Sequence, residues 1–153
     1  MTRAVRTILA LLLLAAALPG CRKEADPVRA TLDALAAAAD DRDADAVEGL
    51  LASAYADAEH GDRTAAVLTI RRYFAAYESI SASFSDLEID WKPDLARATF
   101  TASFNGSPRK FGSLDAMLPR TAKVKFEMNL VPEEGGWKVS WAGWSVVPGS
   151  EGP

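Results

Sequence analysis

Hydrophobic residues in the first half of the chain recur every three or four positions, the period of an α-helix. The three stripes are Val28, Leu32, Leu35 and Ala39, then Val47, Leu50, Leu51 and Ala54, then Ala66, Ile70, Phe74 and Tyr77. Asp26-Pro27 places an N-cap and a helix-starting proline before the first stripe, and Asp62 can cap the third. We expect helices over residues 27–40, 47–54 and 63–78.

From residue 80 onward, hydrophobic and polar residues alternate, the period of a β-strand. In ISASFSDLEIDW (80–91), the apolar residues 80, 82 and 84 are in one phase and 87, 89 and 91 are in the other. A change of phase within one strand predicts a bulge or a sharp bend, which we place near Ser85-Asp86.

Three further alternating segments follow, each with one apolar face. The inward residues of the first two are expected to be Ala96, Ala98, Phe100, Ala102 and Phe104, then Val124, Phe126, Met128 and Leu130. The last begins with Trp137, Val139 and Trp141 in one phase and changes phase at Gly143 before Trp144 and Val146, so we expect Trp141 to be largely buried. This order predicts an α+β fold, with three N-terminal helices packed on a strongly curved antiparallel meander sheet of about four long strands.

The first twenty residues have the three parts of a secretory signal. Arg3 and Arg6 give a basic start, residues 8–18 (ILALLLLAAAL) an apolar middle, and Pro19-Gly20 a non-helical exit. As a helix the apolar part spans only about 16 Å, which is too short for a hydrocarbon core of about 30 Å.

The only cysteine, Cys21, follows this segment directly. Leu18-Pro19-Gly20-Cys21 resembles the bacterial lipoprotein box, in which the cysteine is acylated and becomes the first residue of the mature protein; Pro19 departs from the usual pattern. The resemblance implies a lipid anchor at Cys21, and Arg22 in place of an aspartate implies sorting to the outer membrane, facing the periplasm. The alternative is a plain signal peptide that leaves a free thiol, a liability in an oxidising compartment.

The predicted organisation is a lipoprotein signal peptide (1–20), a lipidated cysteine with a short linker (21–25), one domain (26–147) and a flexible tail (148–153). Residues 1–20 hold two of the chain's 17 basic residues and none of its 21 acidic ones, so the mature chain has 15 basic and 21 acidic residues and a net charge of −6. An acidic chain argues against nucleic-acid binding.

The order of elements resembles the nuclear transport factor 2-like superfamily, the cone-shaped, cystatin-like fold shared with ketosteroid isomerases and polyketide cyclases. The resemblance covers residues 27–147. It is most specific in YADAEHGDR (55–63), in LTIRRYF (68–74) and in GGWKVSWAGW (135–144), which are similar to a group of bacterial lipoproteins of this fold. The fold hosts enzymes, binding proteins and scaffolds alike, so the resemblance does not by itself imply an activity.

The ketosteroid isomerase-like enzymes of this superfamily combine a carboxylate base with a phenol and a neutral carboxylic acid inside the cone. Here Tyr55, Tyr73 or Tyr77 can supply the phenol and Asp57 the carboxylate, but the predicted inward strand positions include no acid. Asp57 can equally tie the turn before Gly61 together. The candidate ligand-pocket residues are Tyr55, Asp57, Phe74, Tyr77, Phe100, Phe126 and Met128.

Metal and cofactor chemistry finds little support in the sequence. Asp41, Asp43 and Asp45 have the spacing that opens an EF-hand, but Ala46 and Ala52 stand where that loop needs Gly and Glu. These acids are better explained as a solvated turn at a helix start. The single histidine, His60, lies just before a glycine, and we assign it a surface or capping role rather than that of a base. We expect no metal and no cofactor.

The segment 105–122 is the longest gap between predicted strands and is locally basic, through Arg109, Lys110 and Arg120. It can contact anionic lipid headgroups, cap a pocket, or serve only for solubility.

Together these patterns predict a lipid-anchored envelope protein that binds a small apolar ligand or a protein partner without catalysis. The alternative is an isomerase- or cyclase-like enzyme with a Tyr/carboxylate site. A homodimer is compatible with the sequence, which does not determine the oligomeric state.

Overall fold

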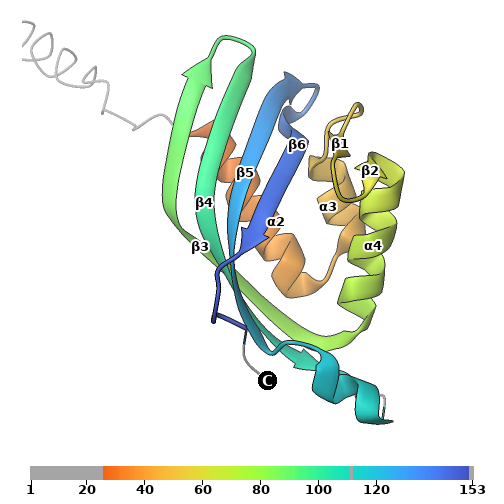
Figure 1. Ribbon diagram of the computed structural model, residues 1–153. Coiled ribbons are helices and arrows are strands. Elements are labelled where there is room, and N and C mark those ends of the chain that lie inside the picture. Colours follow the sequence, from red (N-terminus) through yellow and green to blue (C-terminus); the bar gives the residue numbers. More distant parts are fainter. Residues whose placement is uncertain (1–25, 111, 152–153) are drawn as a thin grey trace, which may run out of the picture.

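The computed structural model describes residues 26–110 and 112–151 of the 153-residue chain. The described part of the domain is α+β, with three α-helices, one short 3-10 helix and a four-stranded antiparallel sheet in the order β3-β4-β5-β6. The helices are α2 (Pro27–Asp41), α3 (Ala44–Leu50), α4 (Arg63–Ala75) and the short 3-10 helix η2 (Gly112–Met117). The sheet strands are β3 (Tyr77–Lys92), β4 (Leu95–Pro108), β5 (Thr121–Glu133) and β6 (Gly136–Val146), and a small hairpin is formed by β1 (Ala56–Asp57) and β2 (Gly61–Asp62). Figure 1 shows the three α-helices behind the sheet and to one side of it.

Each α-helix begins at an aspartate that caps it. Asp26 accepts hydrogen bonds from the backbone N–H groups of Val28 and Arg29, Asp43 from that of Ala46, and Asp62 from that of Ala65. These side chains satisfy backbone donors that a helix start leaves without a partner. The capping positions predicted at residues 26 and 62 are therefore confirmed, and Asp43 of the acidic turn serves as a cap.

The second helix is shorter than the apolar stripe predicts. It ends at Leu50, and Leu51 is already extended, with ψ of 140°. Leu51 forms a parallel bridge with Val139, and the Ala52 N–H donates to the Val139 carbonyl at 2.7 Å. Residues after Leu50 therefore bind β6 instead of continuing the helix, and the prediction that the helix reaches residue 54 is wrong.

The bend predicted in the first strand is present. The register of β3 against β4 shifts between Ser85 and Glu88, and Asp86 adopts a positive φ of 56°. Phe84 before the bulge and Leu87 and Ile89 after it all pack against the hydrophobic core. The bulge lets both phases of the strand face the same side of the sheet.

The bend in β6 lies nearer the start of the strand than expected. Leu130 pairs with Val139 but Asn129 pairs with Trp141, so Ser140 is the extra residue. The phase therefore changes before Trp141, which faces the outer side of the sheet, while the neighbouring Ala142 is 6% exposed in the core. Trp141 is partly buried on that outer face, outside the core, and the bend predicted at Gly143 lies at Ser140 instead.

The core lies between the helices and the inner face of the sheet. Its buried members include Val28, Leu32, Leu51, Tyr55, Ala66, Val67, Ala96, Ala98, Phe100, Ala102, Leu130, Val139 and Ala142. The inward strand residues predicted from alternation on β4 and β5 belong to this core or pack against it, apart from Val124, which is buried without being a member of it.

Within the described part of the chain, no helix is long and apolar enough to cross a bilayer. The predicted signal peptide, lipidation site and linker (1–25) lie outside the described residues. At the other end, the chain stays bonded to β5 as far as Ser150, whose hydroxyl accepts from the Lys123 N–H at 3.0 Å.

Candidate functional site

Tyr55 and Asp57 are joined by a buried hydrogen bond at the turn between α3 and α4. The Tyr55 hydroxyl donates to Asp57 Oδ2 at 2.7 Å, and the two residues are 7% and 8% exposed. The other carboxylate oxygen of Asp57 accepts the backbone N–H groups of Glu59 at 2.8 Å and His60 at 2.6 Å. Asp57 therefore both ties the turn together, as an aspartate commonly does, and holds the phenol.

His60 joins this cluster from the same turn. Its Nδ1 lies 3.3 Å from Asp57 Oδ2, and its ring stacks on the indole of Trp144, with ring centroids 5.3 Å apart and planes at 24°. The His60 side chain is 25% exposed. The surface or capping role assigned from the sequence misses both contacts. The local sequence signals the first, since Asp57 is three residues away, but nothing local signals a partner 84 residues further on.

The electrostatics of the cluster fix its protonation states. Burial disfavours the charged carboxylate, but hydrogen bonds from Tyr55, His60 and Glu59 outweigh it, and the pKa of Asp57 is lowered. Burial, followed by the hydrogen bond to Asp57 and the carboxylate charge, raises the pKa of Tyr55. At neutral pH Asp57 is ionised and Tyr55 is a neutral donor.

In this arrangement His60 is the group of the cluster that can interact with a ligand. The two oxygens of Asp57 already accept three hydrogen bonds, so the carboxylate orients its neighbours. An imidazole that donates from Nδ1 to Asp57 keeps the lone pair of Nε2 free to accept a proton or a ligand hydrogen bond.

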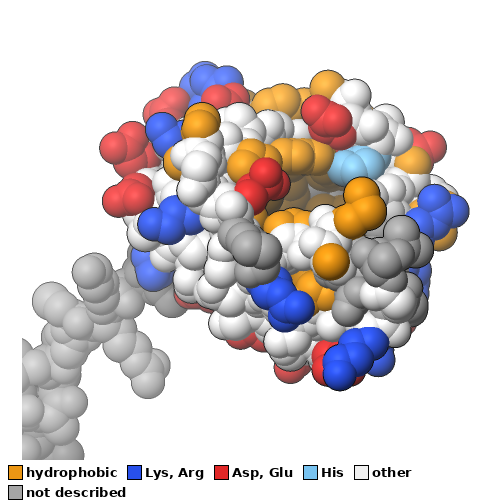
Figure 2. Space-filling view, turned by 60° about the horizontal axis from the view of Figure 1, so that its bottom comes forward, with side chains coloured by type: hydrophobic (Ala, Val, Ile, Leu, Met, Phe, Trp, Pro, Cys, Tyr) orange, Lys and Arg blue, Asp and Glu red, His pale blue; other side chains and the backbone are white. Residues whose placement is uncertain are grey.

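A row of aromatic rings runs from β3 across the inner face of the sheet to His60. Adjacent ring centroids are 5.6 Å apart for Phe84–Phe100, 5.4 Å for Phe100–Phe126, 6.1 Å for Phe126–Trp144 and 5.3 Å for Trp144–His60. We call these five residues the aromatic row. Phe100 is buried and the other four are partly exposed. Figure 2, which brings the bottom of the molecule in Figure 1 forward, shows a hollow lined by hydrophobic side chains, with the histidine at its edge.

The structure brings together four of the seven candidate pocket residues. Tyr55 and Asp57 meet His60, and Phe126 and Phe100 reach it through Trp144. The remaining three are Met128, which packs against the core, Phe74, which is partly exposed on α4, and Tyr77, which lies elsewhere. His60 and Trp144 are the members that sequence reasoning left out.

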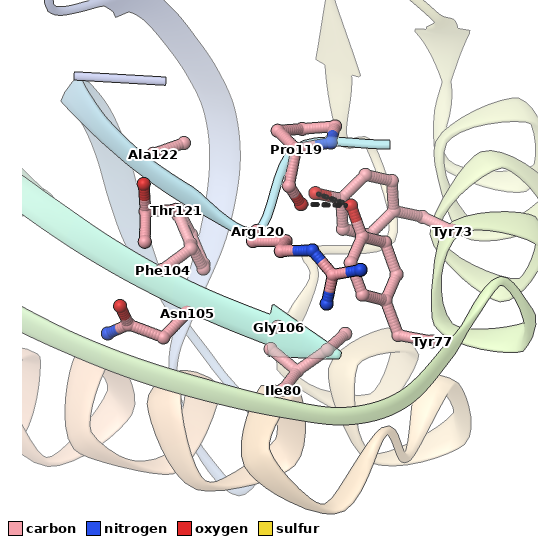
Figure 3. A pocket seen from close by; sticks show the side chains of 10 residues that line it. All are labelled: Tyr73, Tyr77, Ile80, Phe104, Asn105, Gly106, Pro119, Arg120, Thr121 and Ala122. Carbon is pink, nitrogen blue, oxygen red and sulfur yellow. Dashed lines mark hydrogen bonds between the residues drawn. The ribbon is translucent and has the colours of Figure 1, made fainter. Parts of the chain in front are cut away.

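Tyr77 belongs to a separate, closed cluster (Figure 3). Its hydroxyl donates to the Pro119 carbonyl at 2.8 Å and accepts from Tyr73 at 3.4 Å. Burial, together with Tyr73, raises the pKa of Tyr77. The cavity beside these rings has a volume of only about 10 Å³, which is room for no more than one water. A Cβ on Gly106 would lie 2.7 Å from the Tyr77 ring, so this glycine admits the ring. We assign Tyr77 a structural role.

A second concave region lies on the outer face of the sheet. It is a groove of about 590 Å³ whose lining includes the charged residues Asp86, Glu88, Lys125 and Glu127, and also Phe100, Phe126 and Trp144 of the aromatic row. The Trp141 indole lies along it, so close to Gly143 that a Cβ there would be 2.6 Å from the ring. This groove shares no hydrogen bond with the Tyr55–Asp57–His60 cluster among the described residues.

The basic segment after β4 is held against α4. The Arg109 N–H donates to the Ala76 carbonyl at 2.8 Å, and Arg109 Nε donates to the Ala75 carbonyl at 3.0 Å. In Figure 1, η2 lies at the end of the molecule opposite the start of α2. Among the described residues, no group of three or more His, Cys, Asp or Glu side chains is placed to hold a metal ion.

No family model and no curated protein matches the sequence, but solved structures do match the fold. A proposed dehydratase of the NTF2-like family from Streptomyces avermitilis is 17% identical, with 79% of this chain and 94% of that chain covered and a TM-score of 0.68. A proposed scytalone dehydratase from Novosphingobium aromaticivorans is 13% identical (79% and 82% covered, TM-score 0.69). A protein with a cystatin-like fold from Caulobacter vibrioides is 13% identical (83% and 92% covered, TM-score 0.65). The chain therefore has the nuclear transport factor 2-like, or cystatin-like, fold.

Proposed function

We propose that this is a lipid-anchored protein of the cell envelope that binds a small, flat, apolar ligand in the hollow at the end of the aromatic row. The observation that carries the proposal is the Trp144–His60 stack, which joins an apolar surface to one oriented polar group. Ligand pockets characteristically combine an apolar lining with a few fixed polar groups. A ligand with a ring and one hydroxyl or carbonyl group matches this combination.

The binding proposal is tested with 8-anilinonaphthalene-1-sulfonate, a flat apolar fluorophore, and the Cys21→Ser protein, which carries no lipid. We expect saturable fluorescence enhancement that Trp144→Ala weakens at least tenfold, because Trp144 stacks on His60, the histidine at the edge of the hollow. Trp141→Ala, on the outer face, is the matched control and keeps the wild-type affinity. Equal weakening by both variants would contradict binding in the hollow.

The membrane part of the proposal rests on the sequence Leu18-Pro19-Gly20-Cys21. Two or three acyl chains on Cys21 would give stable attachment, whereas one gives only marginal binding. Cys21→Ser is expected to abolish palmitate labelling and to release the protein from membranes. Labelling that survives this substitution would remove the anchor from the account, and fractionation of inner and outer membranes tests the sorting implied by Arg22.

A second candidate function is general acid–base catalysis on a ligand in the same hollow. The observation that favours it is the Asp57 carboxylate, which orients His60 beside the aromatic row. Histidine is the side chain that most often serves as a general acid or base. Two solved structures of this fold are described as proposed dehydratases. A reaction in this hollow would begin with His60 removing a proton from a carbon beside a carbonyl group.

This candidate is tested with 2-tetralone, a flat bicyclic ketone, in D2O. If His60 acts as a base, the wild-type protein accelerates deuterium exchange at the carbon between the ring and the carbonyl, and His60→Gln does not. Ligand binding without accelerated exchange would contradict the catalytic function and would support binding only.

A further inference from the structure

One end of the domain exposes a tryptophan. Trp91, near the end of β3, is 46% exposed, and its ring meets the edge of the Trp137 ring at a centroid distance of 5.4 Å and an angle of 88°. Among the described residues, the other large hydrophobic residues with about this exposure lie on other elements. They are Leu68 and Tyr73 on α4, Met117 on η2 and Val146 at the end of β6.

This end is also where the chain enters the domain. The Thr31 hydroxyl donates a shared hydrogen bond to two carbonyl oxygens, that of Trp137 at 2.9 Å and that of Pro27 at 3.2 Å. The tryptophan pair is therefore adjacent to the first turn of α2. Figure 1 agrees, since the start of α2 and the turn between β3 and β4 lie at the same end, opposite η2 and the C-terminus.

The predicted lipidation site is close to this end along the chain. Cys21 precedes Asp26 by five residues, which span at most about 18 Å when fully extended. A lipid attached at Cys21 therefore keeps the start of α2, and with it Trp91, within this reach of the bilayer surface.

The chemistry of Trp91 fits the interfacial layer of a membrane. Indole has an apolar body and one polar N–H group, and tryptophan is enriched where hydrocarbon meets headgroups. Charge does not favour a contact driven by anionic lipids, because Lys92 beside Trp91 is outnumbered at this end by Asp94, Glu133 and Glu134. The expected contact is therefore insensitive to salt.

We propose that Trp91 inserts into the interfacial layer of the membrane to which Cys21 anchors the chain, so that the domain stands on this end. The orientation rests on the lipid anchor proposed above. It turns the end with η2, where the hollow of Figure 2 opens, away from the bilayer and toward soluble ligands.

The test uses the full lipidated protein in phosphatidylethanolamine vesicles that contain brominated phosphatidylcholine, whose bromine atoms quench nearby tryptophans. We expect part of the protein's tryptophan emission to be quenched, equally at low and high salt. Trp91→Phe, which keeps a ring against Trp137, is expected to lose this quenching. Trp141→Phe is expected to keep it.

Each result bears on a separate part of the account. Absence of quenching in vesicles that retain the wild-type protein, or quenching that survives Trp91→Phe, would overturn the orientation and leave the anchor standing. A Cys21→Ser protein that remains bound to membranes would instead contradict the anchor. Circular dichroism of Trp91→Phe identical to wild type ensures that lost quenching reports the contact and not the fold.

Discussion

Trp141 and Trp144 are three residues apart on the same strand and lie on opposite faces of the sheet. Trp144 faces inward, where it contacts Phe126 and stacks on His60 beside Asp57. Trp141 faces outward, where its ring lies close to Gly143 in the groove on that face. An odd separation along a strand puts two side chains on opposite faces, so only one of the pair can face the hollow.

The difference shows that hydrophobicity alone does not decide which face a strand buries. The inner position next to Trp141 is Ala142, which fits a crowded core, and the outer position two residues on is Gly143, which leaves space for an indole. Small residues therefore identify the two environments better than the tryptophans do. The inner tryptophan, Trp144, stacks on His60 beside Asp57, whereas the outer one, Trp141, packs against the backbone at Gly143.

The largest expected effect is on the inner side, at Asp57. Asp57→Ala removes the acceptor for the buried Tyr55 hydroxyl and for two backbone N–H groups. We expect a loss of about 3–5 kcal/mol in the free energy of unfolding, measured by urea denaturation, because each buried donor left without an acceptor costs about 1–3 kcal/mol. Asp57→Asn keeps the shape and one acceptor and is expected to lose less. A loss below that of Trp141→Ala would contradict the role given to Asp57.

The same contacts predict how stability depends on pH. The lowered pKa of folded Asp57 means that its contribution is complete above the unfolded value of about 3.9 and is lost as the pH falls through the folded value. At the alkaline end, unfolded tyrosines ionise above a pH of about 10 while Tyr55 stays protonated, so stability falls there too. Urea melts of wild type, Asp57→Asn and Tyr55→Phe should show the acid loss shrinking in Asp57→Asn and the alkaline loss shrinking in Tyr55→Phe.

Truncation of Trp144 is expected to have an intermediate effect. Tryptophan-to-alanine changes in full cores cost about 3–5 kcal/mol, and Trp144 is only partly buried, so we expect about 2 kcal/mol. The signature is a coupled change at His60, whose ring loses its stacking partner. Heteronuclear NMR of the imidazole should show shifted resonances in Trp144→Ala, and unchanged ones would mean that the stack does not form in solution.

The smallest effect is expected on the outer face. Trp141→Ala removes a side chain that lies over Gly143 without entering the core, so we expect less than about 1 kcal/mol and a normal fold. Thermal unfolding of both tryptophan variants in one buffer tests the comparison directly. A larger shift for Trp141→Ala than for Trp144→Ala would reverse the assignment of the two faces.

The two bends explain why part of the fold could be predicted and part could not. In β3 the apolar residues change phase across Ser85-Asp86, and the bulge lies there because both halves must face the core. In β6 two positions for the bend leave almost equal apolar faces. The bend lies at Ser140, opposite the Asn129–Leu130 step of β5, and the local sequence of β6 does not contain this pairing.

The end of α3 and the contact between His60 and Trp144 also depend on tertiary contacts that the local sequence does not contain. The apolar stripe continues past Leu50, but a hydrogen bond from Ala52 to Val139 ends the helix, a tertiary effect that outweighs local propensity. Tyr55 and Asp57 could be paired from the sequence because they are two residues apart. Trp144 could not be assigned to them, because its contact with His60 depends on where β6 bends.

The central claim is that the hollow beside Trp144 and His60, and not the groove beside Trp141, binds an apolar ligand. The most direct measurement is an NMR titration of the Cys21→Ser protein with 2-naphthol, observing the indole N–H and imidazole resonances, assigned with single-residue variants. The account predicts that the Trp144 and His60 signals shift together with one dissociation constant while Trp141 stays unchanged. Shifts at Trp141 with Trp144 and His60 unmoved would contradict it.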